Sequence, residues 1–305
     1  MFEGHKIAAV IPARNEAEHI ATVLRDLPQY VDYVVVVDDG STDGTAQVAS
    51  TAGGDRVTVI RNPGPHGVGA ATLAGMTHAA ELGADILVKV DGDGQMDTTY
   101  LESLIEPLVH GSYGYSKANR FLHTDHLRQM PTVRLVGNVL LTFLTKLASG
   151  YWRIFDPQNG FVAIRTDIFR KLPTDHIAKD FFFENDMLIH LNILGVRVKD
   201  IPIPARYGDE ESHLQVWKVL LTFPPRLLRG LCKRIWEKYV LRDFSPIAVF
   251  WLLGVPLLLF GFTFGVWHWV LSIYHGRPAP TGTVMLSVLP FLLGFELILQ
   301  AIVLE

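Results

Sequence analysis

The chain has 305 residues, a formal net charge of −4 and 49% apolar residues. This length allows one large domain or two smaller ones, and the slight excess of acidic residues argues against a general nucleic-acid binder. Cys232 is the only cysteine, which excludes an intrachain disulfide and a cysteine-based metal site and fits a reducing compartment.

The first third of the chain alternates predicted strands and helices. Short apolar runs rich in Val and Ile predict buried strands at 6–13, 31–39, 56–62 and 85–93. Apolar residues at helical spacing predict the helices between them, at 15–30, 41–53 and 67–84. This alternation predicts a parallel, doubly wound sheet, in which ligands bind at the carboxyl ends of the strands. Two acidic segments, VDDGSTDG and VDGDGQMD, lie at such ends.

The middle of the chain continues the same pattern. Helices are predicted at 99–111, 134–149 and 181–195, and strands at 114–121 and 196–207. Between them, 155–172 is predicted to form a loop, a strand and a short helix. Residues 1–213 are therefore expected to form one α/β domain.

The last sixty or so residues are far more apolar than the rest. Segment 244–274 contains no Asp, Glu, Lys or Arg, and segment 283–304 contains only Glu296. Each segment is long enough to cross a bilayer of roughly 30 Å as a helix, so 244–305 is predicted to be a two-helix transmembrane hairpin. Glu296 either faces a partner helix or a polar cavity, where it would be functional, or lies close enough to the end to reach the membrane interface.

The charges that flank the hairpin predict its orientation. Segment 214–243 has seven basic residues, opposed only by Glu237 and Asp243, whereas the loop between the apolar runs has only Arg277. Because basic residues stay on the cytoplasmic side, we expect an integral membrane protein whose α/β domain is cytoplasmic. We expect 214–243 to form amphipathic helices on an anionic membrane surface, the alternative being a solvated helix pair that packs on the domain. A homo-oligomer through the transmembrane helices is left open.

The acidic and glycine-rich segments do not match a calcium loop or a dinucleotide-binding fingerprint. A calcium loop at 91–102 would have Glu102 at its twelfth position, but its sixth is Met96 where the sharp turn requires Gly. The loop that begins at Asp39 has Ser50 at the twelfth position. The segment GVGAAT (67–72) lacks the last Gly of a dinucleotide-binding fingerprint. Calcium and NAD binding are therefore not expected.

A catalytic metal site fits the second acidic segment better. Asp91 and Asp93 point the same way in an extended segment, and Gly92 between them leaves room for a ligand. An ion held by Asp93 and Gln95 would keep open positions, which Mg²⁺ and Mn²⁺ fill with substrate phosphates. Such an ion would neutralise charge on a departing diphosphate. Asp97 is expected to cap the following helix, with Glu102 on its surface.

Three motifs in this order, VIPARNE, VVDDGSTDGT and VDGDGQ, resemble the inverting glycosyltransferases of family 2, which have the GT-A fold. Later segments resemble the polyprenyl- or dolichyl-phosphate sugar synthases of that family, namely ANRF, RLVGN, DPQNGFVAIR, FFFENDM and IPIPARYGDEESHL. The resemblance covers nearly the whole chain. It implies a Rossmann-like, doubly wound, mostly parallel sheet as the catalytic domain at 1–213, followed by amphipathic interfacial helices and two transmembrane helices.

The resemblance also implies roles for individual residues. The nucleotide pocket would be lined by Pro12, Ala13, Asn15 and Glu16, with Asp38 and Asp39 at the base or ribose. The donor diphosphate would be framed by Asp91 and Asp93, and Mg²⁺ or Mn²⁺ would be held by Asp91, Asp93 and Gln95. The acceptor phosphate and donor would be surrounded by Arg120, Arg134 and Arg206, which together with Asp93 form the expected catalytic set. The sugar would lie near Glu184 and Asp186.

General chemistry supports the phosphate-binding role of the three arginines, because a guanidinium is planar, always charged and able to donate two hydrogen bonds to phosphate oxygens. The alternative for each of them is a solvated surface side chain.

Two departures from the family pattern stand out. The chain has NGF at 159–161 where SGF is common, and His213 replaces a Lys, which weakens a fixed positive charge. The motif Gln-x-x-Arg-Trp of processive members does not match at 215–219, so one sugar per turnover is expected.

The expected activity is that of a hexosyltransferase. The oxygen of a polyprenyl (or dolichyl) phosphate would attack the anomeric carbon of a UDP- or GDP-linked sugar in a single inverting displacement, at the cytoplasmic face of the membrane. A phosphate monoester is already anionic at neutral pH, so positioning and electrostatic stabilisation suffice. The alternatives are a membrane-tethered, non-processive glycosyltransferase with a non-lipid glycan acceptor, a catalytically silent nucleotide-sugar-binding scaffold, and a nucleotidyltransferase, for which PARNEAEH is not the required basic Gly-rich loop.

Overall fold

The computed structural model describes residues 1–120, 132–204 and 216–305. Within these ranges the chain forms two compact units, Met1–Leu231 and Cys232–Glu305. The first unit contains the predicted α/β domain, and the second contains the predicted hairpin. The finer division at 213 and 243 stays a prediction.

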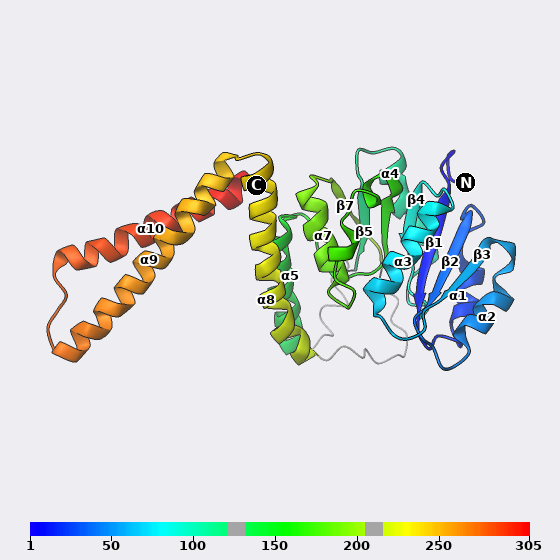
Figure 1. Ribbon diagram of the computed structural model, residues 1–305, viewed down its shortest axis with the longest axis horizontal. Helices are drawn as coiled ribbons and strands as arrows, with labels where there is room; N and C mark the ends of the chain where they lie inside the picture. The colour runs from blue at the N-terminus through cyan, green and yellow to red at the C-terminus, as the bar shows by residue number, and fades with distance from the viewer. Residues whose placement is uncertain (121–131, 205–215) are drawn as a thin grey trace. The chain divides into compact units, whose positions relative to one another are not determined.

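The first unit is built on one seven-stranded sheet (Figure 1). Its strands are β1 (Ile7–Ala13), β2 (Tyr33–Asp38), β3 (Val57–Arg61), β4 (Ile86–Lys89), β5 (Tyr115–Asn119), β6 (Val162–Arg165) and β7 (Val198–Pro202). Their order across the sheet is β3-β2-β1-β4-β6-β5-β7. All neighbours are parallel except β6, which runs antiparallel to both β4 and β5. The expected mostly parallel, doubly wound sheet is confirmed, with one reversed strand inserted beside β4.

Helices cover both faces of this sheet. The side chains of α1 (Ile20–Asp26), α2 (Thr45–Ala52) and α4 (Leu101–Val109) pack into one apolar core. Those of α3 (Val68–Glu81) and α7 (Phe183–Ile193) pack into a second core on the other face. The central strands are apolar on both sides for this reason, and Val34–Val37 are buried throughout. The remaining helical segments of this unit are α5 (Thr132–Ser149), α6 (Thr166–Phe169) and the short turns η1 (Gly54–Arg56), η2 (Thr98–Tyr100) and η4 (Thr174–His176).

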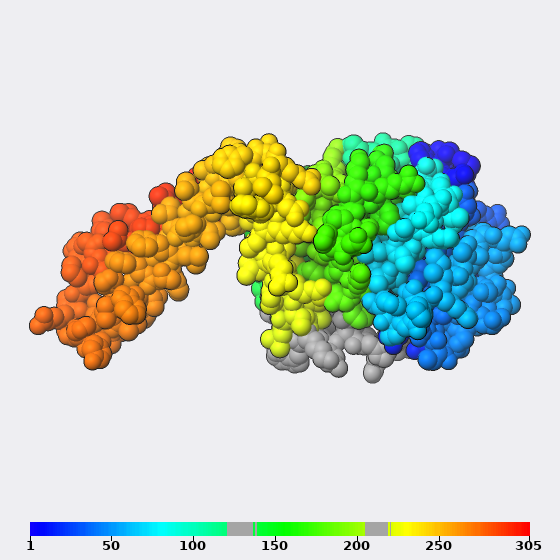
Figure 2. Space-filling view, in the orientation of Figure 1, coloured from blue at the N-terminus to red at the C-terminus, as the bar shows by residue number. Residues whose placement is uncertain are grey.

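Helix α8 (Val216–Arg234), most of which belongs to the first unit, packs one face on the α/β domain of that unit. The Phe223 ring meets that of Phe182 edge-on at 5.1 Å between centroids, and the Arg226 guanidinium donates to the Asp180 carboxylate at 2.7 Å. Its other face is open, with Leu221 and Leu228 74% and 61% exposed; Figure 2 shows the outer side of α8 in yellow. One face of α8 is therefore covered by the domain and the other is exposed, and contact of segment 214–243 with a membrane surface stays a prediction.

The second unit contains the end of α8, the π-helix η5 (Ile235–Arg242) and two long helices, α9 (Pro246–His275) and α10 (Thr281–Leu304). Both long helices are apolar and long enough to span a membrane, and they lie side by side in Figures 1 and 2. A Cβ on Gly261 of α9 would stand 2.5 Å from the backbone nitrogen of Phe291, so this contact requires glycine. Glu296 is exposed on α10 and accepts from Gln300 Nε2 at 3.0 Å.

Candidate active site

Three loops meet at the carboxyl edge of the sheet. β1 lies between β2 and β4, with Ala13 opposite Asp38 and Val10 opposite Lys89. The loops that follow these strands are the three sequence motifs. A Cβ on Gly92 would lie 3.3 Å from Ala13 Cβ and 3.4 Å from Glu16 Cγ. The Asp91–Asp93 turn thus lies against the Pro12–Glu16 loop, and the strand order brings the predicted nucleotide and metal segments together.

The first two loops are held together by reciprocal hydrogen bonds. Asn15 donates its backbone N–H to Ser41 Oγ, and its side-chain Oδ1 accepts from the Thr42 N–H, both at 2.9 Å. Asn15 has a φ of +59°, a conformation that Asn tolerates better than most residues. The Glu16 N–H donates to Thr45 Oγ1 at 2.9 Å. The sequence analysis did not predict a role for Ser41, Thr42 and Thr45. Their place in the STDGT turn could have indicated that they hold the neighbouring loop.

The paired aspartates at the end of β2 face different partners. Asp38 is buried and its Oδ1 accepts from the Ser41 N–H at 3.0 Å. Asp39 accepts from the backbone N–H groups of His66 and Gly67 at 3.0 and 2.9 Å and from Asn62 Nδ2 at 3.0 Å. Burial acts to raise the pKa of Asp39, but these hydrogen bonds outweigh it and lower the pKa. Asp39 therefore holds the loop before α3, and its contact with base or ribose stays a prediction.

The acidic loop after β4 is organised by its own backbone. Asp93 Oδ1 accepts from the Gln95 N–H at 2.9 Å, which turns the chain and keeps Asp93 beside Gln95. The Asp91 N–H points at the Met96 sulfur at 3.2 Å, a contact that the sequence did not suggest. Asp97 accepts from the Thr99 N–H at 3.1 Å and so caps η2, and Glu102 is exposed on α4, both as expected.

The donor set of this loop suits a hard divalent ion with an incomplete protein cage. Asp91, Asp93 and Gln95 carry two carboxylates and one amide oxygen within one short loop. Among the residues that the structure describes, no group of three or more His, Cys, Asp or Glu side chains forms a metal cage. An ion held here would need phosphate or water oxygens to complete its shell, which fits Mg²⁺ or Mn²⁺.

A buried lysine, Lys89, forms an ion pair with Asp91. Lys89 Nζ lies 2.6 Å from Asp91 Oδ1 and 3.3 Å from Glu184 Oε1, and the Lys89 side chain is 1% exposed. Glu184 comes from the first turn of α7 and is itself buried. Asp186 points elsewhere: its Oδ2 accepts from the Ala178 N–H at 2.8 Å. Glu184 thus lies at the acidic loop, whereas the Asp186 carboxylate orders the loop before α7. The sequence motifs did not indicate Lys89 as a site residue. A charged residue inside the apolar run ILVKV was the signal that could have done so.

The arginines are only partly described. Arg120 follows β5, and its guanidinium donates to both Asp156 oxygens, at 2.7 and 2.9 Å. Asn159 Nδ2 also donates to Asp156 Oδ2, at 3.1 Å. Arg134 lies in the first turn of α5, and its side chain is outside the described part of the structure. Arg206 and His213 lie outside the described residues. Asp156, in the segment DPQNG, was not predicted as the partner of Arg120.

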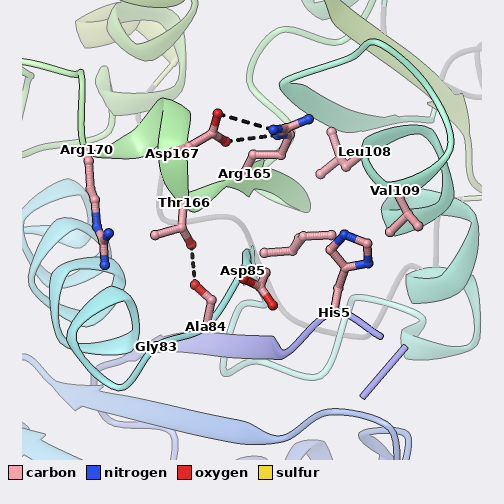
Figure 3. Close-up of a pocket in the computed structure, with 11 residues that line it drawn as sticks. His5, Gly83, Ala84, Asp85, Leu108, Val109, Arg165, Thr166, Asp167 and Arg170 are labelled. Carbon is pink, nitrogen blue, oxygen red and sulfur yellow. Dashed lines mark hydrogen bonds and ion pairs between the residues drawn. The ribbon is translucent and has the colours of Figure 1, made fainter. Parts of the chain in front are cut away.

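A separate cavity of about 500 Å³ lies at the opposite end of β4 (Figure 3). Its polar lining includes Asp85, Arg165 and Arg170, and it contains none of the predicted site residues. The Arg165 guanidinium pairs with Asp167 at 2.9 Å, and Arg170 Nη2 donates to the Ala80 carbonyl at 2.9 Å. Since ligands of such sheets bind at the carboxyl edge, this cavity is not the candidate active site.

The fold is shared with sugar-transferring enzymes. A crystal structure of glucosyl-3-phosphoglycerate synthase from Mycobacterium tuberculosis, in complex with Mn²⁺, UDP-glucose and phosphoglyceric acid, matches with a TM-score of 0.57 and 22% sequence identity. The match covers 76% of this chain and 80% of that one. The same synthase was also solved with Mg²⁺ and UDP, with a TM-score of 0.56. At this identity the likeness establishes the fold, and the expected GT-A architecture is confirmed.

The sequence establishes the family. Residues 8–173 match the model of glycosyl transferase family 2, and the chain belongs to this family. UDP-N-acetylglucosamine–dolichyl-phosphate N-acetylglucosaminyltransferase from Methanococcus voltae is 30% identical over 218 residues, which are 67% of this chain and 86% of the relative. Polyprenol monophosphomannose synthase from Mycolicibacterium smegmatis is 30% identical over 208 residues, 64% of this chain and 75% of the relative. The expected resemblance to lipid-phosphate sugar synthases is confirmed.

Proposed function

We propose that this protein transfers a single sugar from a UDP- or GDP-linked donor to a polyprenyl or dolichyl phosphate, with inversion at the anomeric carbon. The observation that carries the proposal is the contact of Gly92 with Ala13 and Glu16. This close approach of the Pro12–Glu16 loop and the Asp91–Asp93 turn, which are expected to bind nucleotide and metal, supports the proposal. The two relatives named above, whose names specify dolichyl phosphate and a polyprenol product, support a lipid phosphate as acceptor.

The donor would lie across the three loops. Its nucleoside would occupy the side of Pro12–Glu16 and Asp38, and its diphosphate the side of Asp91 and Asp93. A Mg²⁺ or Mn²⁺ ion held by Asp91, Asp93 and Gln95 would supply positive charge to the departing diphosphate. The matched synthase structures, solved with Mn²⁺ and UDP-glucose or with Mg²⁺ and UDP, support this choice of ion for the fold.

The acceptor needs positive charge rather than a base, because a phosphate monoester is already anionic at neutral pH. Arg120 would supply part of that charge, and its bidentate bond to Asp156 fixes its position. Arg134 and Arg206 would supply the rest. The protein would then act by positioning donor and acceptor and by electrostatic stabilisation, not by proton transfer. Glu184 would lie near the sugar, next to Asp91.

The acceptor lipid would reach the site from the membrane. Helices α9 and α10 are long and apolar enough to span it. The exposed Leu221 and Leu228 on α8 would lie at its surface, with the catalytic domain on the cytoplasmic side. Protease protection in sealed vesicles tests the orientation: cleavage of the N-terminal unit from the cytoplasmic side alone is expected.

The activity is tested with membranes that contain the full chain. They are incubated with radiolabelled UDP- and GDP-sugars and Mn²⁺ and extracted with organic solvent. Label that enters the solvent phase, and that mild acid releases as free sugar, supports a lipid-phosphate acceptor. Label that stays with water-soluble or glycan material would instead support a membrane-tethered transferase with a non-lipid acceptor. Absence of transfer from every donor would refute both.

A further inference from the structure

Lys89 has an unusual place for a charged side chain. It lies at the end of β4, between strands β1 and β6, and its side chain is 1% exposed. Its neighbours along the strand, Ile86 to Val88, are fully or almost fully buried apolar residues. Burying a charge is costly unless it is paired. Lys89 is paired twice, with Asp91 Oδ1 at 2.6 Å and with Glu184 Oε1 at 3.3 Å.

The two carboxylates compensate the charge of this buried lysine. The same ammonium therefore joins two elements. Asp91 belongs to the loop after β4, and Glu184 belongs to the first turn of α7. Without this cation, the buried Glu184 carboxylate and the partly exposed Asp91 carboxylate would lack a compensating charge.

The segment NGF at 159–161 leaves room for this arrangement. A Cβ on Gly160 would lie 2.9 Å from Asp91 Oδ2 and would overlap Lys89 Nζ. Gly160 is not among the glycines with a positive φ, so its backbone conformation is open to other residues. The need for glycine here is a need for space. Any side chain at this position must push the ammonium or the Asp91 carboxylate away.

We propose that Lys89 is a positioning residue of the donor site. By bridging Asp91 and Glu184, it holds the Asp91 carboxylate toward the metal and diphosphate and ties the start of α7 to the same loop. Gly160 is required because it leaves the space for the bridge. This inference rests on the proposed function, since it assigns a role within the same site. A purely structural ion pair is the competing explanation, and it predicts an effect on stability alone.

Gly160→Ala tests the position of the bridge without removing a charge. The full chain in detergent is titrated with Mn²⁺ and UDP, and in parallel with Mn²⁺ and GDP, by calorimetry. With whichever nucleotide binds the parent protein, we expect affinity for the metal–nucleotide pair to fall at least about tenfold, or about 1.4 kcal/mol. The melting temperature is expected to fall as well, because the displaced ammonium loses part of its pairing, so the titration is run well below it and reports on folded protein. Gly282→Ala is the matched control, because a Cβ there meets open space, and it should change neither quantity.

A second set of variants separates positioning from stability. Lys89→Met should lower both the melting temperature and the affinity, because it leaves Asp91 and Glu184 without their shared cation. Adding Glu184→Gln removes the buried negative charge, so the double variant should recover much of the melting temperature. Under the proposal it does not recover the affinity for Mn²⁺ and nucleotide, since Asp91 still lacks its bridge.

Two results would overturn the inference. One is a double variant that regains both stability and affinity, and the other is a Gly160→Ala chain that binds Mn²⁺ and nucleotide as the parent does. A parent protein that binds neither nucleotide with Mn²⁺ would instead refute the proposed function. Failure of the inference and failure of the function are therefore distinguished by the parent titration alone.

Discussion

The carboxylate of Asp156 holds the guanidinium of Arg120 through two hydrogen bonds, of 2.7 and 2.9 Å. Asp156 is 2% exposed, and its φ is +51°. The pair connects the end of β5 to the segment DPQNG, whose Gly160 lies against Asp91. An arginine expected at the acceptor phosphate is thus joined, through one short segment, to the loop expected to hold the metal.

Asp156→Asn should therefore reduce both stability and activity. The substitution keeps the size of the side chain but replaces charge-assisted bonds, and we expect a loss of about 1.5–3 kcal/mol in the free energy of unfolding. Sugar transfer should fall because Arg120 loses its fixed orientation. Urea unfolding of the full chain in detergent measures the first effect. Asp175→Asn, at an exposed aspartate, is the control and should be neutral.

The stability contributed by Asp156 should depend on pH. Burial acts to raise the pKa of Asp156, but the hydrogen bonds and charge of Arg120 outweigh it and lower the pKa. A carboxyl with a depressed folded pKa contributes stability that is fully present above its unfolded value of about 4 and is lost as the pH falls through the folded value. The gap between parent and Asp156→Asn should be constant above about pH 5 and close below about pH 4. A gap that widens in acid would contradict this.

Asp93→Ala should strongly reduce transfer while the fold is kept. Asp93 orders the acidic loop through the Gln95 N–H and is expected to hold the metal. We expect kcat to fall at least about a hundredfold, as for the loss of a key electrostatic contact, and the melting temperature to change little. Asp55→Ala, in the exposed turn η1, serves as the control. Full activity of the parent in excess chelator would contradict the role of a metal.

Asp39→Ala should free the loop before α3. Its carboxylate accepts hydrogen bonds from the backbone amides of His66 and Gly67. These two residues directly precede α3. The loss of about 1.5–3 kcal/mol per charged hydrogen bond would speed hydrogen exchange of these two amides about 10- to 150-fold. Amides of Val35 and Val36 in β2 should keep their protection. Unchanged exchange at His66 and Gly67 would show that Asp39 does not anchor this loop.

Gly261→Val should separate α9 from α10. The added side chain would meet the backbone of Phe291 and break the bond from Ser287 Oγ to the Gly261 carbonyl, which is 3.0 Å long. The hairpin should become more susceptible to proteolysis in detergent and should melt at a lower temperature. Gly282→Val, in open space at the start of α10, should have no such effect. Equal behaviour of the two variants would show that the close contact is not needed.

Much of the site was predictable because its groups are adjacent in sequence. The residues of a motif such as VDGDGQ specify its local conformation. The strand ends there, Gly92 allows the Pro12–Glu16 loop to come close, and Asp93 and Gln95 lie on one short turn. The apolar period and the turn residues likewise determined the elements and the two long apolar helices, and the motifs VIPARNE, VVDDGSTDGT and VDGDGQ indicated the family by resemblance. These are local properties, which the order of residues alone specifies.

The tertiary structure alone decided which charged residues, distant in sequence, form ion pairs. Lys89 and Glu184 meet because α7 packs on the sheet face behind β4, and Asp156 meets Arg120 because β6 returns antiparallel between β4 and β5. Neither pair has a local signature, since a buried charge takes whichever partner the packing brings within reach. The sequence by itself determined the fold class, the family and the three loops at the sheet edge. Packing determined the charged pairs that hold those loops in place.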